Sequence, residues 1–240
     1  MTSVPRWPAW VEPPDGAYAG PVPRRANARH LSILARRGGS LDALDLGCGG
    51  ADYRHPIRDV LGHRYVGVDV AGEHTDVVAN ACALPFRSRS FDHVITNAVL
   101  EHVTDPQTAV REVSRVLRPG GYFTGSAAFL EPHHLHSHFH LAPDGMVHAL
   151  EAAGLSVEGL WPEEDWLVYD SLASMPGPVS GPARWMLRRI ATMERFLKGR
   201  HFHPRELATG RWLRQRAPET RREAFMTVTG QVHFLSVKPT

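Results

Sequence analysis

The chain is short of cysteine, of long apolar runs and of net charge. It has 2 cysteines in 240 residues, too few for the disulfide framework of a small secreted domain. No stretch approaches the roughly 20 apolar residues that a membrane-spanning helix needs. The N-terminus is rich in proline and tryptophan and lacks the apolar core of a secretory signal. We therefore expect a cytoplasmic protein without a membrane partner.

Low-complexity runs and internal repeats are absent as well. Hydrophobic residues make up 42% of the chain, which is enough to build a proper core. A length of 240 residues suits one domain, or one domain with an insertion.

The basic residues gather in one part of the chain. Residues 181–223 hold 12 Arg or Lys against 4 Asp or Glu, a net charge of +8, whereas the whole chain carries +2. Such asymmetry is typical of proteins with an anionic partner. The simpler interpretation is a solvated arginine face on surface helices, and both stay open.

The most informative segment runs from Ala43 to Ala51, where a short apolar run breaks into a glycine-rich turn. This pattern predicts a buried strand that delivers a backbone loop to a ligand, because glycine has no Cβ to hold the ligand away. A dinucleotide-binding G-x-G-x-x-G loop starting at Gly47 needs its third glycine at position 52, which is Asp52. A carboxylate there repels a pyrophosphate, so a cofactor without phosphates is favoured.

Two later segments fit a nucleoside ligand. A second apolar run, Arg64 to Asp69, ends in a carboxylate 24 residues after Asp45. At the tip of a strand, such a carboxylate can accept two hydrogen bonds from ribose hydroxyls. The segment from Asn80 to Asp92 then reads NACALPFRSRSFD.

In this order, the segments resemble the class I S-adenosylmethionine-dependent methyltransferases. Residues 45–49 resemble the family motif D-x-G-x-G. Residues 80–92 resemble D-A-x-x-L-P-F-x-x-x-S-F-D, with Asn80 in place of the usual aspartate. Residues 115–121 resemble R-x-L-K-P-G-G, the turn that enters the fifth strand. The resemblance covers roughly residues 40–160 and a terminal strand.

The resemblance implies S-adenosylmethionine as the cofactor. It assigns ribose binding to Asp69, and the adenine edge to Asn80 and the backbone after it; the Asn80 side-chain carbonyl can accept from the adenine amino group. The loop after the fourth strand lies beside the methionine moiety, where His102 shapes the loop. The implied cofactor-binding residues are Asp45, Gly47, Cys48, Gly49, Asp69, Val70, Asn80, Ala81, Cys82, Asn97, Ala98 and His102.

The resemblance also implies an α/β fold: a Rossmann-like, seven-stranded, mostly parallel sheet with helices on both faces and a helical cap insertion. One antiparallel strand is expected at the edge of the sheet. Roughly 60 residues separate the last two strands, far more than a hairpin needs. We therefore expect an extended proline-rich arm at residues 1–23, a methyltransferase core at 24–162 and 225–240, and an inserted helical cap at 163–224.

Periodicity and turn signals place the individual elements. Asp105 and Pro106 form a good N-cap and first turn for a helix. In the cap, an apolar stripe at helical spacing, starting at Met186, predicts a helix packed on the core. Helices are expected over 24–37, 106–117 and 146–153, and strands over 43–46, 64–69, 91–97, from 122 onward, 155–161 and 225–237.

Catalytic chemistry is expected from a histidine-rich loop after the fifth strand. Five histidines fall within residues 133–140, where the acceptor site should lie. Histidine is the usual base near neutral pH for an alcohol acceptor. The candidate bases, in order of preference, are His133, His138, His134 and His136.

No metal ion is assigned to this loop. Its His-x-His spacing offers a metal alternative, with Glu131 and Asp144 as the nearby carboxylates. A further alternative is that several of the histidines only hydrogen-bond loop backbone.

The predicted function is methyl transfer to a small-molecule acceptor, with a hydroxyl of a sugar or secondary metabolite favoured and an anionic acceptor compatible with the basic segment. One alternative is a protein that binds the cofactor but acts as a non-methylating cyclase or binding subunit. A nucleic-acid methyltransferase is disfavoured, because residues 96–99 lack an N-P-P-Y-type motif.

Overall fold

The computed structural model describes residues 18, 20, 28–134, 136–163, 166–174, 180–199 and 229–240, with side chains as far as residue 193 in the helix 181–199. The predicted arm at 1–23 and much of the predicted cap at 163–224 therefore lie outside the described residues.

A seven-stranded sheet in the order β3-β2-β1-β4-β5-β7-β6 forms the centre of the molecule. Strands β1 to β5 pair in parallel, and β7 pairs antiparallel with both β5 and β6. The strands are β1 (Asp42–Leu46), β2 (Arg64–Asp69), β3 (Val77–Val78), β4 (Phe91–Asn97), β5 (Leu117–Ala128), β6 (Ser156–Pro162) and β7 (Gln231–Val237).

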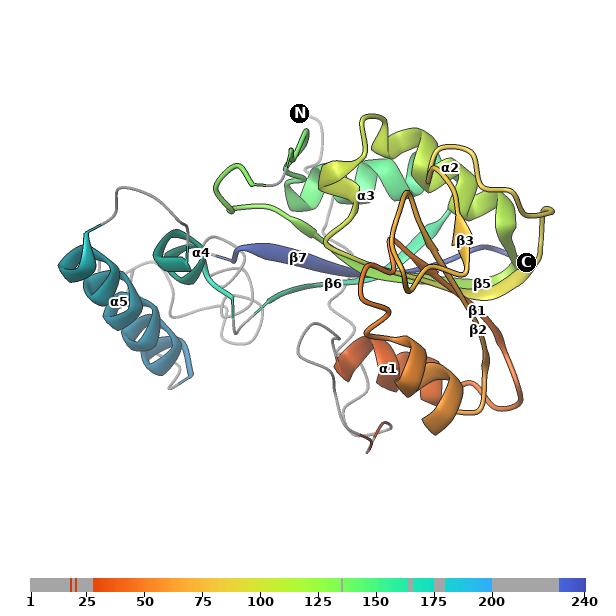
Figure 1. Ribbon diagram of the computed structural model, residues 1–240, viewed down its shortest axis with the longest axis horizontal. Coiled ribbons are helices and arrows are strands. Elements are labelled where there is room, and N and C mark those ends of the chain that lie inside the picture. Colours follow the sequence, from red (N-terminus) through yellow and green to blue (C-terminus); the bar gives the residue numbers. More distant parts are fainter. Residues whose placement is uncertain are drawn as a thin grey trace, which may run out of the picture.

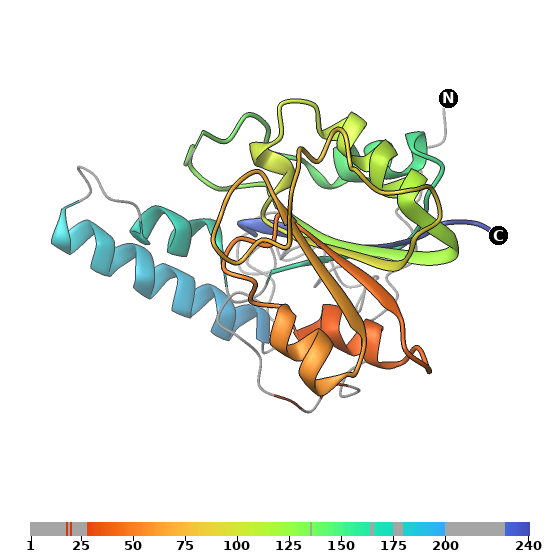
Figure 2. The same cartoon turned by 45° about the vertical axis from the view of Figure 1, so that its right-hand side comes forward.

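Helices cover both faces of this sheet (Figures 1 and 2). On one face lie α1 and a short π-helix, η1; on the other lie α2 and α3, which contact each other. The helical elements are α1 (Ala28–Ala35), η1 (His55–Val60), η2 (Leu100–His102, a 3-10 turn), α2 (Pro106–Val116), α3 (Pro143–Ala152), α4 (Val168–Ser174) and α5 (Gly181–Gly199). Among the described residues, no helix is long and apolar enough to cross a membrane.

Each face of the sheet has its own apolar core. The larger core joins the sheet to α2 and α3 through residues such as Val113 and Met146, both fully buried. The smaller core joins it to α1 and η1, and includes Tyr18 from the arm. Tyr18 therefore packs on the α1 face of the sheet.

The element predictions agree with the structure to different degrees. The ranges of β2 and β4 match, and Asp105 caps α2 by accepting from the Thr108 N–H at 2.9 Å. The antiparallel strand was wrongly placed at the edge: β7 is the penultimate strand, because β6 returns to pair on its outer side. β5 already begins at Leu117, and residues 118–121 bulge out between its first pair with β4 and the next.

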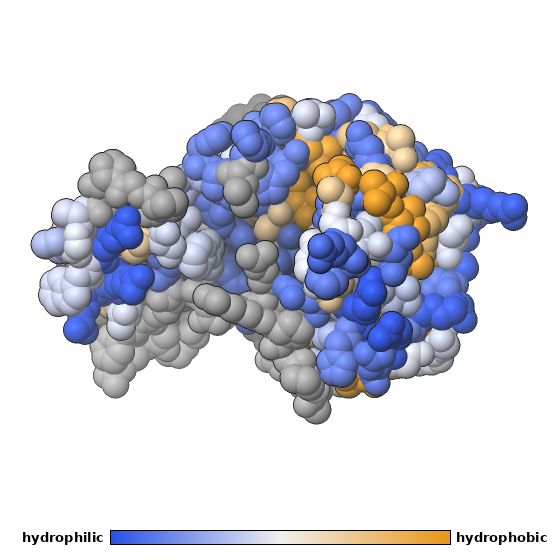
Figure 3. All heavy atoms as spheres, in the orientation of Figure 1, coloured by the Kyte–Doolittle hydropathy of each residue, from blue (hydrophilic) through white to orange (hydrophobic). Residues whose placement is uncertain are grey.

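The described part of the cap segment lies at the carboxyl-terminal edge of the parallel strands. β6 runs parallel to β5, since both are antiparallel to β7, so α4 follows β6 at that edge. Helix α5 packs on α4 and extends away from the sheet (Figures 1 and 2). The apolar stripe of α5 that starts at Met186 was predicted to pack on the core. In the described part of α5 this is wrong, because Met186 and Met193 are 54% and 55% exposed. Figure 3 shows a mostly hydrophilic surface over α4 and α5.

Gly125 in β5 permits a close approach of two strands that a larger residue would prevent. A Cβ there would lie 2.4 Å from the Thr96 carbonyl oxygen of β4 and 3.0 Å from the Phe234 ring of β7. We expect Gly125→Ala to lower the free energy of unfolding by about 2 kcal/mol or more, because backbone must move to make room. Urea denaturation measures this change.

Gly181→Ala is the matched control, since a Cβ at Gly181 meets nothing within 4 Å. It should change the free energy of unfolding by no more than about 0.5 kcal/mol. Equal stability of the Gly125→Ala and control variants would contradict this account of the sheet.

Candidate functional site

The loops that follow β1, β2 and β4 meet at the carboxyl edge of the sheet, and the glycine loop after β1 is the tightest of them. Gly47 has a φ of +75°, and its N–H donates to the Val68 carbonyl of β2 at 2.7 Å. A Cβ on Gly47 would lie 2.2 Å from a methyl carbon of Val99, in the loop after β4. Only glycine tolerates both the positive φ and the close approach of Val99. Gly47 therefore lets the carboxyl ends of β1, β2 and β4 pack together.

Asp69 at the end of β2 is held by the neighbouring backbone. Its carboxylate accepts from the Gly49 N–H at 2.9 Å and from the Val70 N–H at 2.7 Å. Each oxygen keeps a lone pair for a further donor. Val70, the next residue, is 70% exposed, which leaves an apolar side chain beside this carboxylate.

Beneath the glycine loop, Asp45 is a buried carboxylate. It accepts a hydrogen bond from the Tyr65 hydroxyl at 2.7 Å. Burial raises the pKa of Asp45 to about 7; the Tyr65 hydrogen bond opposes this rise, and the negative charges of Asp52 and Asp69 add to it. The site therefore contains a carboxyl group that changes charge near neutral pH.

The predicted adenine segment forms a turn of its own. The Asn80 side-chain oxygen accepts from the Cys82 N–H at 2.8 Å, and the Ala83 N–H donates to the Asn80 carbonyl at 2.9 Å. Asn80 is exposed, whereas Ala81 is buried. The asparagine that replaces the usual aspartate thus stabilises its loop directly, as Asx turns do.

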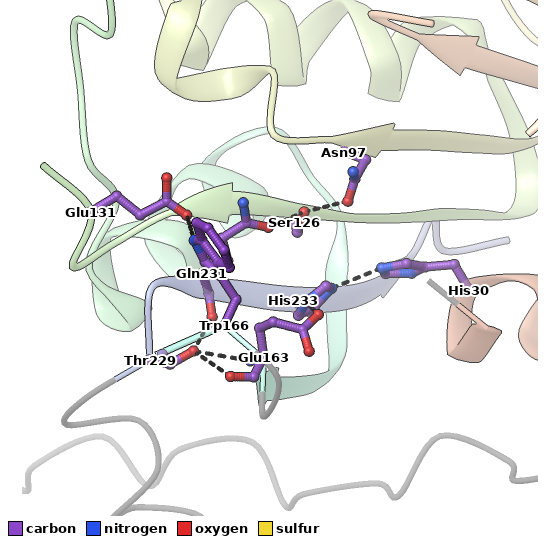
Figure 4. Close-up of polar contacts among 9 residues, drawn as sticks. All are labelled: His30, Asn97, Ser126, Glu131, Glu163, Trp166, Thr229, Gln231 and His233. Carbon is purple, nitrogen blue, oxygen red and sulfur yellow. Dashed lines mark hydrogen bonds and ion pairs between the residues drawn. The ribbon is translucent and has the colours of Figure 1, made fainter. Parts of the chain in front are cut away.

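The end of β4 meets β5 and β7 through side chains (Figure 4). The Ser126 hydroxyl donates to the Asn97 side-chain oxygen at 2.7 Å, and the Gln231 amide group lies 3.1 Å from the same hydroxyl. After Asn97 the chain turns sharply: Ala98 has a φ of +53°, a conformation that residues other than glycine seldom adopt. Neither Ser126 nor Gln231 was predicted, because Gln231 lies more than 100 residues further along the chain.

The histidine loop docks on η2. The backbone N–H groups of His138 and Phe139 donate to the Glu101 carbonyl at 2.6 and 3.2 Å. This brings His134 beside η2, with the His134 and His102 rings in an edge-on arrangement, 5.2 Å between centroids. His134, His102 and the Glu101 carboxylate each present one donor atom, all within 4.8 Å of one another.

The four candidate bases differ in their surroundings. His134 is half-buried, and its Nδ1 lies 2.9 Å from the Pro132 carbonyl and 3.7 Å from a Glu131 carboxylate oxygen. His133, His136 and His138 are exposed. His134, third in the predicted order, is therefore the one placed against buried groups.

Glu101 was not predicted, although it stands beside His102 in the sequence. Its side chain is fully buried, and burial raises its pKa to about 7. Backbone N–H groups of Glu101 itself and Ala128 counteract this rise, whereas the charge of Glu131 adds to it. Glu131 in turn accepts from the Trp166 indole N–H at 2.9 Å (Figure 4).

A second chain of polar contacts runs from α1 through β7 to Glu163, just after β6 (Figure 4). His233 Nδ1 lies 3.0 Å from His30 Nε2, and His233 Nε2 lies 2.9 Å from a Glu163 oxygen. Trp161 stacks on the His233 ring. Burial and the neighbouring positive groups hold the pKa of His30 well below its usual range, so His30 is neutral and links α1 to the sheet.

Comparison with a family model gives a match over the segment that runs from β1 into β5. Residues 44–124 match a family model described as a methyltransferase domain. The ubiquinone/menaquinone biosynthesis C-methyltransferase UbiE of Hahella chejuensis is 58% identical over 45 residues, 19% of this chain and 18% of that protein. The O-methyltransferase resE of Aspergillus sclerotiorum is 31% identical over 107 residues, 38% of this chain and 40% of that protein. The chain thus spans less than half the length of either relative.

Among solved structures, phosphoethanolamine N-methyltransferase 2 of Haemonchus contortus, in complex with S-adenosyl-L-methionine, aligns with a TM-score of 0.53. The alignment covers 89% of this chain and 53% of that one, at 16% sequence identity. At this identity the likeness concerns the fold alone.

The buried Asp45 makes a specific contribution to the pH dependence of stability. Its pKa is about 7 in the folded chain against about 3.9 unfolded, so the folded state holds the proton more tightly. The contribution of Asp45 to the free energy of unfolding is fully present below about pH 4. It is lost as the pH rises from there through 7, and the total loss is up to about 4 kcal/mol. As the pH rises from 5 to 7.5, the native chain should therefore lose this contribution, whereas the Asp45→Asn variant should not.

Urea denaturation at the two pH values measures this difference. Glu101 also titrates near 7, so the native chain and the variant will both lose stability with pH, but the native chain will lose more. Parallel pH profiles for the two proteins would show that Asp45 is ionised at both pH values.

Proposed function

We propose that this chain, a member of the class I S-adenosylmethionine-dependent methyltransferases, moves the cofactor's methyl group to a hydroxyl of a small molecule, a sugar or a secondary metabolite. The observation that carries the proposal is the meeting of the glycine loop and the Asp69 carboxylate at the carboxyl edge of β1 and β2. In open α/β sheets, ligands bind at this edge. Two free cysteines agree with a cytoplasmic location.

The residues around this edge offer what the cofactor's parts require. The open lone pairs of Asp69 suit the ribose hydroxyls, and exposed Val70 offers an apolar surface to the adenine ring. The turn at Asn80, Ala81 and Cys82 suits the adenine edge, with the second lone pair of the Asn80 oxygen available to the amino group. The methionine part would lie between Asp45, the backbone of residues 47–49, Asn97, Ala98 and His102.

The cofactor supplies the electrophilic methyl group, so the protein mainly has to orient the acceptor and remove its proton. His134 suits the second task. Its Nδ1 faces a carbonyl oxygen, which can only accept, so the proton resides on Nδ1 and Nε2 keeps a free lone pair. The half-buried side chains of Gln231, which contacts Ser126, and Glu131, which accepts from Trp166, are proposed to orient acceptor hydroxyls.

The acceptor is proposed to be small, and an anionic group on it would suit the arginine-rich segment 181–223. The relatives compared above are named for different methylated atoms: UbiE is a C-methyltransferase and resE is an O-methyltransferase. A cofactor-binding cyclase is the alternative; it would bind S-adenosylmethionine yet release no S-adenosylhomocysteine with any acceptor.

We predict that Asp69→Ala weakens S-adenosylmethionine binding by roughly 10- to 150-fold, because charge-assisted hydrogen bonds to ribose contribute about 1.5–3 kcal/mol. Isothermal titration calorimetry on the folded variant measures the loss. Glu73→Ala, an exposed carboxylate in the loop after β2, is the matched control and should bind like the native chain. Unchanged affinity in Asp69→Ala would refute the ribose assignment.

We predict that His134→Ala lowers turnover by about 10²- to 10⁴-fold while the affinity for S-adenosylmethionine is kept, because a positioned base contributes in that range. S-adenosylhomocysteine release in the presence of candidate acceptors is the measurement. His148→Ala, an exposed histidine on α3, is the control. Native turnover in His134→Ala, with a flat profile from about pH 5.5 to 8, would exclude His134 as the base.

A further inference from the structure

We propose that Glu101, His102 and His134 form a binding site for one divalent transition-metal ion, at the acceptor side of the cofactor pocket. Their donor atoms lie within 4.8 Å of one another and come from two chain segments, η2 and the loop after β5. This inference deepens the proposed function and rests on it for the site's role, but the site itself can be tested without the cofactor.

The first argument is the condition of Glu101. Its side chain is fully buried, and neither carboxylate oxygen has a hydrogen-bond partner of acceptable length and angle within the described chain. Buried carboxylates are normally paired, hydrogen-bonded or bound to a metal, because an isolated buried charge is very costly. The nearby Glu131 carboxylate increases the need for a cation.

The second argument is the orientation of His134. A histidine that ligates a metal usually donates its other ring N–H to a carbonyl or carboxylate, which fixes the ring. His134 has this arrangement already: Nδ1 lies 2.9 Å from the Pro132 carbonyl, with Glu131 at 3.7 Å. Nε2 is therefore the nitrogen left to bind an ion. The indole N–H of Trp166 in turn holds Glu131 in place.

The third argument is that the backbone holds the two segments together without a metal. The Glu101 carbonyl accepts from His138 and Phe139, so the loop is docked on η2 before any ion arrives. Donor atoms around tetrahedral zinc lie about 3.3 Å apart, so small side-chain rotations would close the set. Two imidazoles and one carboxylate suit zinc, cobalt, iron(II) or manganese, with positions left for water or an acceptor hydroxyl.

The experiment uses the full chain, stripped with EDTA and dialysed, and needs neither cofactor nor acceptor. Co²⁺ is added and followed by its visible absorption, and Zn²⁺ is titrated by calorimetry. We expect one ion per chain, and a higher Tm with Zn²⁺. Glu101→Gln keeps the shape of the buried side chain and should weaken Zn²⁺ binding by about 10-fold or more, as should His134→Ala.

Exposed residues of α3 provide matched controls: Glu151→Gln and His148→Ala should bind Zn²⁺ like the native chain. Circular dichroism establishes folding, and the His134→Ala variant decides if Glu101→Gln fails to fold. The proposal is overturned if the folded native chain binds neither ion, or if the controls lose as much affinity as the cluster variants. Metal binding without S-adenosylmethionine binding would instead reject the proposed function and leave the metal site standing.

Discussion

The close packing of Gly47 against Val99 is the contact on which the rest of the site depends. It brings the loop after β1 onto the loop after β4, with no room for a Cβ between them. Two residues beyond Val99 stands Glu101, whose carbonyl receives the histidine loop from β5. One glycine therefore sets the distance between the Asp69 side of the site and the His134 side. An in-line displacement needs such fixed spacing, because small misplacements of the reacting atoms cost large factors in rate.

Two buried carboxyl groups give this site its electrostatic character. Asp45 lies under the glycine loop and Glu101 lies under the histidine loop, and burial raises the pKa of each to about 7. Tyr65 offers Asp45 a hydrogen bond, whereas Glu101 has nearby backbone N–H groups but no hydrogen bond of acceptable geometry. A cation placed near either group would favour its charged form and lower its pKa. Both halves of the site are built to receive positive charge.

Local patterns in the sequence predicted the strands that carry backbone loops and the residues at their tips. Asp45, Gly47 and Asp69 could be located because an apolar strand followed by glycine or a carboxylate is a short-range signal. Ser126 and Gln231 could not, since their contact depends on β7 inserting between β5 and β6. The sequence could not indicate either which of the candidate histidines is buried. His133 and His134 are neighbours, yet docking on Glu101 leaves one exposed and the other half-buried.

The two roles considered for His134 compete for a single nitrogen. Nδ1 is committed to the Pro132 carbonyl, so Nε2 can take the acceptor's proton or bind an ion, but not both at once. Glu101 distinguishes the roles physically. A catalytic base can act with or without a carboxylate beside it, so the base role alone does not explain the buried position of Glu101. An ion held by Glu101, His102 and His134 would polarise the acceptor hydroxyl, and in that state His134 would serve as a ligand while the ion assists loss of the proton. The buried carboxylate is thus the feature that a base alone leaves unexplained, and His134 would act as the base in the metal-free chain and as a ligand in the metal-bound one.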